Sequence, residues 1–263
     1  MAQASILYEA REGVARITLN RPEVLNSFNA AMAMTLQQIL AEVARDPELR
    51  AVYLTGSGRA FCAGQDLAEA VPEQGGGITD FAAHVRTLYN PLVLALRRMP
   101  KPVVCGVNGV AAGAGANLAL ACDIVVAAEE ASFLQAFVKI GLVPDTGGTW
   151  ALPRLVGGAQ AAALMLLGDK IPAARAQQLG MIYQVCPAAD LEATGLGLAR
   201  LLATQPTYAL SLIKQLLAAS SSNSLEQQLE MEAEHQGLAG RSEDYAEGVQ
   251  AFLAKRKPIF TGK

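Results

Sequence analysis

A single carboxylate stands in an apolar, turn-rich segment near the middle of this 263-residue chain. Between residues 134 and 152 the only charged side chains are Lys139 and Asp145, and Asp145 lies within the run GLVPDTGGTW. An aspartate there can cap a helix that starts at Thr149 or Trp150, or it can act as a general base. An apolar shell would raise its pKa by disfavouring the charged form, which suits a base near neutral pH. The expected shell is Phe137, Leu142, Val143 and Trp150.

Two glycine-rich turns could supply the rest of such chemistry. They are RAFCAGQDL at residues 59–67 and NGVAAGAGAN at residues 108–117, and neither has the spacing of a phosphate-binding loop. Taken singly, each indicates only a tight backbone. Each also follows a buried strand and can open a helix, so its first N–H groups would lack helical partners. Two such groups aimed at one oxygen would stabilise an enolate.

Histidine chemistry is poorly supported. The chain has two histidines, His84 and His235, and both fall on helical patterns, where we expect solvated or partly buried helix faces. A histidine-dependent triad or a histidine-rich metal site needs a different pattern. Any catalysis is therefore expected from carboxylates and backbone groups.

Composition excludes several other classes of protein. The chain is 52% hydrophobic and 17% charged, with a net charge of −3, so it can bury a sizeable core and offers no basic footprint for nucleic acid or membrane. The uncharged stretch 103–122 contains four glycines and predicts a buried strand–turn–helix rather than a membrane span. Acidic residues near the N-terminus are unlike a signal peptide. Four scattered cysteines predict buried free thiols in a reducing compartment, so we expect a cytoplasmic protein.

Apolar patterning predicts an N-terminal α/β part followed by a helical part. The expected strands are 6–9, 14–19, 51–55, 103–107, 123–127 and 182–185. One helix is expected to start near Asn29, a second to span Phe81 to Leu96, and a third, short one to end at Leu120. The later expected helices are 159–167, 173–179, 191–204, 207–219, 224–238 and 242–254. A glycine run at 75–77 predicts a flexible break. We therefore expect a core of repeated strand–strand–helix units at 1–195 and a helical region for subunit packing at 196–263.

Four motifs, taken together, resemble one known family. In chain order they are LNRPEVLNSFN, GRAFCAGQDL, VNGVAAGAGANLALACDIVVAAEEASF and IGLVPDTGGT. They are similar to the crotonase (enoyl-CoA hydratase/isomerase) superfamily, and the likeness runs from the N-terminal hairpin to FLAKRKPIF. The resemblance implies an α/β spiral of repeated ββα units with a C-terminal helical trimerisation region, assembled as a homotrimer or a dimer of trimers. It also implies an acyl-CoA thioester substrate, with coenzyme A as part of that substrate and no separate cofactor or metal.

The resemblance also implies roles for individual residues. The backbone N–H groups of Gln65 and Ala114 would form an oxyanion hole around the thioester oxygen. The implied substrate or coenzyme A contacts are Leu25, Ala63, Gln65, Asp66, Leu67, Ala68, Gly113, Asn117, Phe137 and Lys255. Lys255 begins a basic C-terminal run that could meet the coenzyme A phosphates across a subunit boundary, and a solvated terminus explains that run equally well.

The departures from the family pattern narrow the reaction. Enoyl-CoA hydratases carry glutamates at two positions that hold Asn117 and Phe137 here, and neither side chain can activate water or deliver a proton. Asp145 stands where hydratases have glycine. The run LVPDTGGTWALPRLVG is most similar to the branch of ring-1,2-epoxyphenylacetyl-CoA isomerases. That likeness implies that Asp145 shuttles a proton while a ring epoxide becomes a seven-membered oxepin, with helix capping as its subsidiary role.

Other interpretations stay open at this point. The same scaffold could isomerise an aliphatic enoyl-CoA or dienoyl-CoA with Asp145 as its base. A dehalogenase-like enzyme would use Asp145 as a nucleophile on an aromatic ring. A chain that has lost both hydratase glutamates could also be a non-catalytic acyl-CoA-binding trimer.

Overall fold

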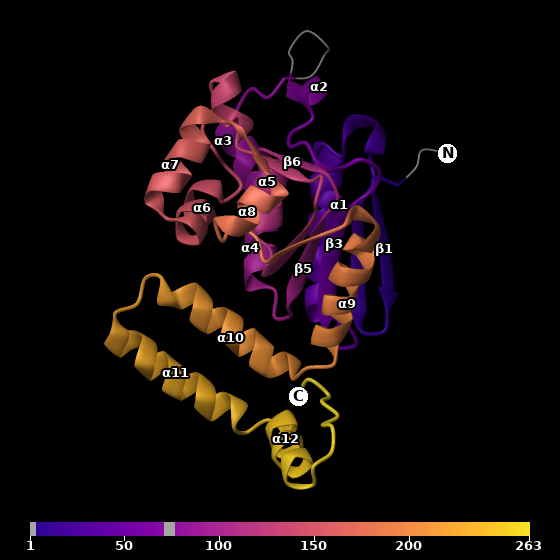
Figure 1. Cartoon of the computed structure of the whole chain (residues 1–263), viewed down its shortest axis with the longest axis vertical. Helices are drawn as coiled ribbons and strands as arrows, with labels where there is room; N and C mark the ends of the chain where they lie inside the picture. The colour runs from indigo at the N-terminus through magenta and orange to yellow at the C-terminus, as the bar shows by residue number, and fades with distance from the viewer. Residues whose placement is uncertain (1–3, 71–76) are drawn as a thin grey trace.

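Two β-sheets built from the same repeated unit form the body of the molecule (Figure 1). The computed structural model describes residues 4–70 and 77–263, so most of the glycine break expected at 75–77 lies outside the described residues. The six-stranded sheet has the order β1 (Ile6–Arg11), β2 (Val14–Leu19), β3 (Ala51–Gly56), β5 (Val103–Val107), β7 (Ile124–Ala128) and β10 (Gln184–Cys186). β1 and β2 form the expected antiparallel hairpin, and the later neighbours are parallel.

The second sheet was not predicted from the sequence. Its order is β4 (Ala60–Cys62), β6 (Val110–Ala112), β8 (Ser132–Leu134) and β9 (Lys170–Pro172), and the first three are mutually parallel. Three-residue strands are too short to show an alternating pattern. The expected repeat is nevertheless present, because successive units place their first strand in the large sheet and their second strand in the small one.

Buried apolar runs explain the large sheet. AVYLTG in β3 and VVCGV in β5 are apolar on both faces and almost wholly buried, as expected for central parallel strands. On one face, α1 (Ala30–Arg45) begins at Asn29, whose side chain accepts a hydrogen bond from the Met32 N–H at 2.9 Å. α1 packs against α4 (Asn90–Arg98). The helix expected from Phe81 to Leu96 is three pieces, because a π-helical turn, η3 (Val85–Tyr89), separates α3 (Phe81–His84) from α4.

The opposite face of the large sheet is covered by α9 (Leu191–Ala203), which packs against β3 and β5 (Figure 1). Ala199 and Ala203 of α9 meet the buried Tyr53 and Val104. The expected division between residues 195 and 196 falls inside this helix, and the division into two parts stays a prediction. All four cysteines are buried free thiols, as predicted. Within the described ranges, no helix has both the length and the apolar character that crossing a bilayer requires.

Shorter elements connect these layers. They are η1 (Pro22–Val24), α2 (Leu67–Ala70), α5 (Ala114–Leu120), η4 (Ala136–Ile140), α6 (Gly148–Val156), α7 (Gly158–Leu167), α8 (Ala173–Gln178) and η5 (Ala188–Asp190). The uncharged stretch 103–122 forms β5, β6 and α5, so the expected strand–turn–helix is confirmed.

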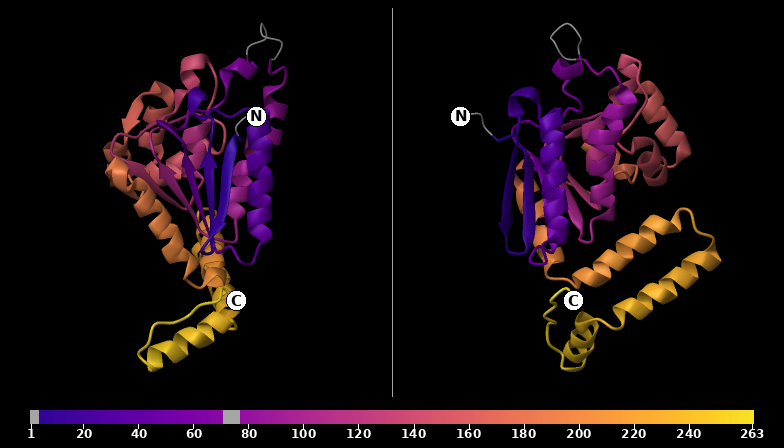
Figure 2. Two further views of the ribbon diagram at one scale, coloured as in Figure 1. Left: turned by 90° about the vertical axis from the view of Figure 1, so that its right-hand side faces the viewer. Right: turned by 180° about the vertical axis from the view of Figure 1, so that it is seen from behind.

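Three C-terminal helices project from the body as an arm. They are α10 (Thr207–Ser220), α11 (Leu225–Ala239) and α12 (Glu243–Leu253), and α11 packs along α10 (Figures 1 and 2). Large apolar side chains of the arm are exposed; they include Leu217, Leu225, Leu229, Phe252 and Leu253. A surface of this kind suits contact with another subunit, so assembly through the arm remains our expectation.

Candidate active site

One edge of the small sheet brings together three turns that lie far apart in the sequence. Because β4, β6 and β8 run parallel, their carboxyl ends meet, and ligands bind at such ends in open α/β sheets. The turns that follow these strands line a cavity of about 380 Å³ together with the Asp145 segment. The predicted site residues that line this cavity are Ala63, Gln65, Leu67, Gly113, Ala114, Phe137 and Asp145.

Two backbone N–H groups are available to a ligand in this cavity. The Phe28 N–H donates to the Gly64 carbonyl at 2.7 Å and the Asp66 N–H donates to the Phe28 carbonyl at 2.8 Å, so the Gln65 N–H between them points away from Phe28. Ala114 is the first residue of α5, where an N–H has no helical acceptor. Within residues 4–70 and 77–263, neither N–H has a hydrogen-bond acceptor.

Glycine conformation brings these two donors close together. Gly64 has a φ of 97° and Gly113 has a φ of 51°, in the left-handed region that glycine tolerates. A Cβ on Gly64 would lie 3.0 Å from the Ala112 carbonyl oxygen and 3.6 Å from the Ala114 nitrogen. The first turn therefore touches the second, and both N–H groups line the same cavity.

Asp145 is the only carboxylate among the described residues that line the cavity. Burial raises its pKa above the ordinary value, while a hydrogen bond from the Thr146 hydroxyl to Asp145 Oδ1 (2.7 Å) and the nearby His84 offset part of that rise. The direction agrees with the sequence-based prediction. The expected capping role is wrong, because α6 begins at Gly148 and its cap residue, Gly147, makes no side-chain capping bond. The carboxylate faces the cavity instead.

His84 and Tyr89 are site residues that sequence reasoning missed. His84 lies at the end of α3 and is half-buried, as expected for a helix face. It also lines the cavity, which was not expected, and its Nε2 lies 2.9 Å from Gln65 Oε1. The Tyr89 hydroxyl donates to the same oxygen. An amide oxygen only accepts hydrogen bonds, so Nε2 of His84 carries its proton here. The π-helical turn that starts directly after His84 ends at Tyr89; such turns are frequent at functional sites, and no sequence pattern predicts this one.

Three of the implied contact residues do not line the described cavity, and two of them support the first glycine turn from behind. The Leu25 carbonyl accepts a hydrogen bond from the Ala63 N–H at 3.0 Å. Asp66 forms an ion pair with Arg21 at 2.8 Å, and both side chains are largely buried. Ala68 lines a separate outer groove beside the cavity. Leu25, Asp66 and Ala68 therefore lie outside the described lining of the cavity, and their contact with an acyl-CoA stays a prediction.

Asn117 and Lys255 also lie outside the described lining of this cavity, and a Lys255 contact with coenzyme A across a subunit boundary stays a prediction. Asn117 is 1% exposed and absent from the described cavity lining, because its side-chain amide is used by two protein partners. Lys255 follows α12, which lies at the opposite end of the molecule from α2 and α3 (Figure 1), so it does not reach the cavity of its own chain. Lys139 is the lysine among the described lining residues, with a half-exposed side chain and a loose ion pair to Asp169 at 4.0 Å.

The apolar shell around Asp145 differs from the expected one. Phe137 and Leu142 line the cavity, as predicted. Val143 is 79% exposed, and Trp150 lies outside the cavity with the guanidinium groups of Arg97 and Arg154 at 5.4 and 4.3 Å from its ring. Other apolar residues line the cavity in their place: Ile140 of the same segment, and Ile78, Phe81 and Val85 of an earlier one.

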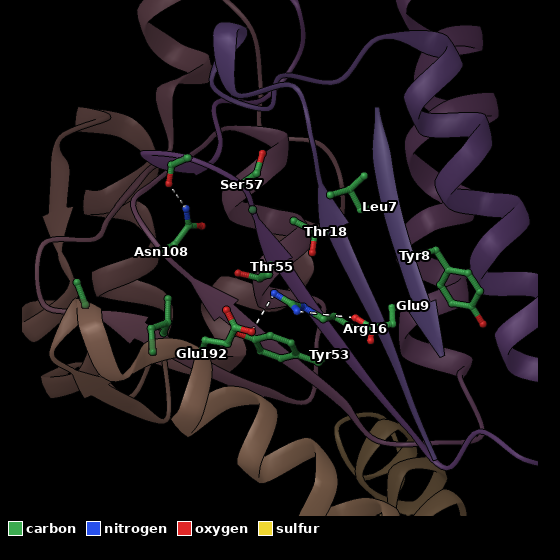
Figure 3. A pocket seen from close by; sticks show the side chains of 14 residues that line it. Leu7, Tyr8, Glu9, Arg16, Thr18, Tyr53, Thr55, Ser57, Asn108 and Glu192 are labelled. Carbon is green, nitrogen blue, oxygen red and sulfur yellow. Dashed lines mark hydrogen bonds and ion pairs between the residues drawn. The ribbon is translucent and has the colours of Figure 1, made fainter. Parts of the chain in front are cut away.

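A second cavity of about 640 Å³ lies beside the large sheet and is unlike the first (Figure 3). Arg16 lies in it between two carboxylates, 2.9 Å from Glu192 and 3.9 Å from Glu9, so its charge is already compensated. The described lining of this second cavity contains none of the site residues predicted from the sequence. The smaller Asp145 cavity is therefore the candidate active site, although the polar one is larger.

Comparison with known proteins agrees with this geometry. The Enoyl-CoA hydratase/isomerase family model matches residues 9–263. A 1,2-epoxyphenylacetyl-CoA isomerase of Escherichia coli (strain K12) is 54% identical over 258 residues, which cover 98% of each chain. A Rhodobacter capsulatus protein named "Probable enoyl-CoA hydratase" is 49% identical over 100% of both chains. The crystal structure of an enoyl-CoA hydratase from Polaromonas sp. JS666 matches with a TM-score of 0.90 at 35% identity, covering 98% of this chain and 100% of that one. The chain therefore belongs to the enoyl-CoA hydratase/isomerase family of enzymes.

Proposed function

We propose that this enzyme isomerises ring-1,2-epoxyphenylacetyl-CoA to the seven-membered oxepin-CoA, with Asp145 as the proton shuttle. The observation that carries the proposal is one half-buried carboxylate and two backbone N–H groups that have no acceptor among the described residues, around a single, mainly apolar cavity. The Escherichia coli relative with 54% identity bears the name of this activity and supports it.

The reaction needs only groups that the cavity contains. Asp145 takes a proton from the carbon beside the thioester, and the thioester oxygen, held by the Gln65 and Ala114 N–H groups, takes up the negative charge. The carbon–carbon bond of the epoxide breaks as the oxygen enters the ring, and Asp145 returns the proton to a ring carbon. Atoms and electrons balance without a co-reactant. The raised pKa of Asp145 favours the first step, because it makes the carboxylate a stronger base.

Hydration is the activity that relatives with hydratase names suggest, and the cavity does not favour it. Phe137 lines the wall where a second acid would be needed, and Asn117 is buried behind it. A hydratase must hold a water with one acid–base group and protonate carbon with another. One carboxylate can shuttle a proton, and it cannot do both of those tasks at once.

The remaining features of the proposal concern the substrate and assembly. The substrate is an acyl-CoA thioester that carries its own coenzyme A, and Lys139 beside the cavity is placed to meet a phosphate. We propose a homotrimer or a dimer of trimers in the cytoplasm, formed through the apolar arm of α10, α11 and α12. Light scattering on the purified enzyme tests the assembly, and a monomer would contradict it.

The decisive experiment follows the ring-epoxide thioester directly. Its ultraviolet spectrum should change when the enzyme is added, while the mass of the product stays equal to that of the substrate. A product heavier by one water would show hydration instead. A covalent adduct on Asp145 after incubation with a halogenated aromatic acyl-CoA would favour the dehalogenase-like alternative, and binding without any turnover would leave a non-catalytic acyl-CoA-binding protein.

A further inference from the structure

The turn that carries Asp145 is held by a side chain from another element. Asp145 to Gly148 form a tight turn in which the Gly148 N–H donates to the Asp145 carbonyl at 2.9 Å. Its two central residues have positive φ, 50° at Thr146 and 74° at Gly147, as in a type I′ turn. Thr146 is β-branched, and such residues rarely adopt that conformation. The turn is therefore strained, and strain of this kind persists only where surrounding contacts enforce it.

Asn117 of α5 supplies such a contact. Its Nδ2 donates to the Asp145 carbonyl at 2.8 Å, and its Oδ1 accepts a hydrogen bond from Gln135 Nε2 at 2.8 Å. Asn117 is 1% exposed and Gln135 is fully buried. A carbonyl oxygen accepts only, so the Asn117 amide must present its NH₂ group to Asp145 and its oxygen to Gln135. The chain of partners thus fixes the orientation of the amide.

Packing leaves this amide little freedom to move. A Cβ added to Gly148 would overlap the Asn117 amide, so the start of α6 rests directly on that group. The Thr146 side chain is 2% exposed and donates its hydroxyl to Asp145 Oδ1 at 2.7 Å. The backbone and the carboxylate of Asp145 are therefore fixed together, the first by Asn117 and the second by Thr146.

From this geometry we infer that Asn117 is a positioning residue, which clamps the strained turn and so aims the Asp145 carboxylate into the cavity. Asn117 belongs to α5, which packs against α6, and it lies outside the described cavity lining. It therefore acts through Asp145 and not on the acyl group. The inference rests on the proposed role of Asp145 as the proton shuttle. It predicts a loss of turnover with no loss of acyl-CoA affinity.

Two variants and a matched control test the inference. Asn117→Ala removes both hydrogen bonds, and Asn117→Leu removes them while nearly filling the space. Asn20→Ala is the control, because Asn20 is also a buried asparagine whose Nδ2 donates to a backbone carbonyl, that of Ala4 at 2.8 Å, at the N-terminal hairpin. The assay is exchange of the protons beside the thioester of phenylacetyl-CoA in D₂O, with phenylacetyl-CoA affinity measured separately by calorimetry.

We expect kcat for exchange to fall about 10- to 100-fold in both Asn117 variants, the scale of a 1 Å misplacement of a catalytic group. The Kd of phenylacetyl-CoA should stay within about twofold, and Asn20→Ala should keep the parental rate. The acid limb of kcat/KM should move to lower pH, because a loosened carboxylate is better hydrated. The other titratable groups in the described cavity lining are His84, Tyr89 and Lys139, of which His84 and Tyr89 interact electrostatically with Asp145, and all three are unchanged in these variants.

Two outcomes would overturn the inference about Asn117. The first is parental exchange with an unmoved acid limb in Asn117→Leu. The second is a loss of rate matched by an equal loss of affinity, since Asn117 would then contact the substrate.

Asp145→Asn, measured in the same assay, separates this inference from the proposed function. If Asp145→Asn keeps full exchange, the proposed function fails. If Asp145→Asn loses exchange while the Asn117 variants keep it, the proposed function stands and the role of Asn117 as a clamp fails.

Discussion

Replacing Asp145 by asparagine tests the proposed chemistry most directly. The variant keeps the size of the side chain, and its amide can still accept the Thr146 hydroxyl, so the strained turn should survive. The described cavity lining offers no second carboxylate. The lost carboxylate therefore has no direct substitute among the described lining residues.

The expected loss is at least about 100-fold in kcat for isomerisation, the lower end of the range for a general base. That factor corresponds to about 2.7 kcal/mol of transition-state stabilisation. Affinity for the thioester should be nearly unchanged, because the N–H groups of Gln65 and Ala114 remain. The assay follows conversion of the ring-epoxide thioester by its ultraviolet spectrum. Near-parental turnover by a correctly folded variant would refute the assignment of Asp145.

Stability gives a second and independent readout of the same substitution. Folding raises the pKa of Asp145, so the folded protein favours the protonated carboxyl, and ionising it costs stability as pH rises through that raised pKa. Below about pH 4 the side chain is protonated in both folded and unfolded states, and the cost disappears. Asp145→Asn should therefore have a higher Tm than the parent at neutral pH and an equal Tm at low pH. A lower Tm at pH 7 would show that burial does not disfavour the charge.

The remaining predictions concern the other parts of the cavity. Ala114→Pro should lower isomerisation about 100- to 1000-fold by removing one donor; proline is well tolerated at the first residue of a helix, and circular dichroism checks that the variant folds. Gln65→Ala keeps its N–H and should retain more than about a tenth of the activity, whereas a loss as deep as that of Ala114→Pro would give the side-chain amide a chemical role. Hydration of crotonyl-CoA should stay below about 1 s⁻¹, the lower end of ordinary enzyme turnover, in a direct absorbance assay. Lys139→Ala should raise KM several-fold with kcat unchanged, and steady-state kinetics that show the reverse would exclude a contact limited to binding.

Much of the framework could be predicted from local sequence. Runs such as VVCGV are apolar throughout, and such a run bounded by turn residues predicts a buried strand wherever it lies. Asn29 marks the start of α1 because its side chain caps the helix it precedes. Asp145 could be identified for a similar reason, because a lone carboxylate in an apolar segment is visible in the local sequence and does not depend on residues that are distant in the chain.

The small sheet and the capping role of Asp145 could not be predicted in the same way. β4, β6 and β8 have three residues each, and their pairing depends on strands contributed by different repeats. The residues after Asp145 form a turn with two positive φ angles, which moves the helix start to Gly148 and turns the carboxylate inward. Val143 and Trp150 lie outside the described cavity lining, although they are as apolar as Phe137 and Leu142.

The sequence by itself therefore determined which groups are available for chemistry: one carboxylate in an apolar segment and two glycine turns. Only the tertiary structure decided which of these groups meet. It placed the Gln65 turn against the Ala114 turn, brought His84 to Gln65, and used Asn117 to hold the Asp145 carbonyl. The physical reason is that hydrogen bonds and side-chain directions depend on backbone angles and on neighbours 19 to 50 residues away, and no local pattern records either.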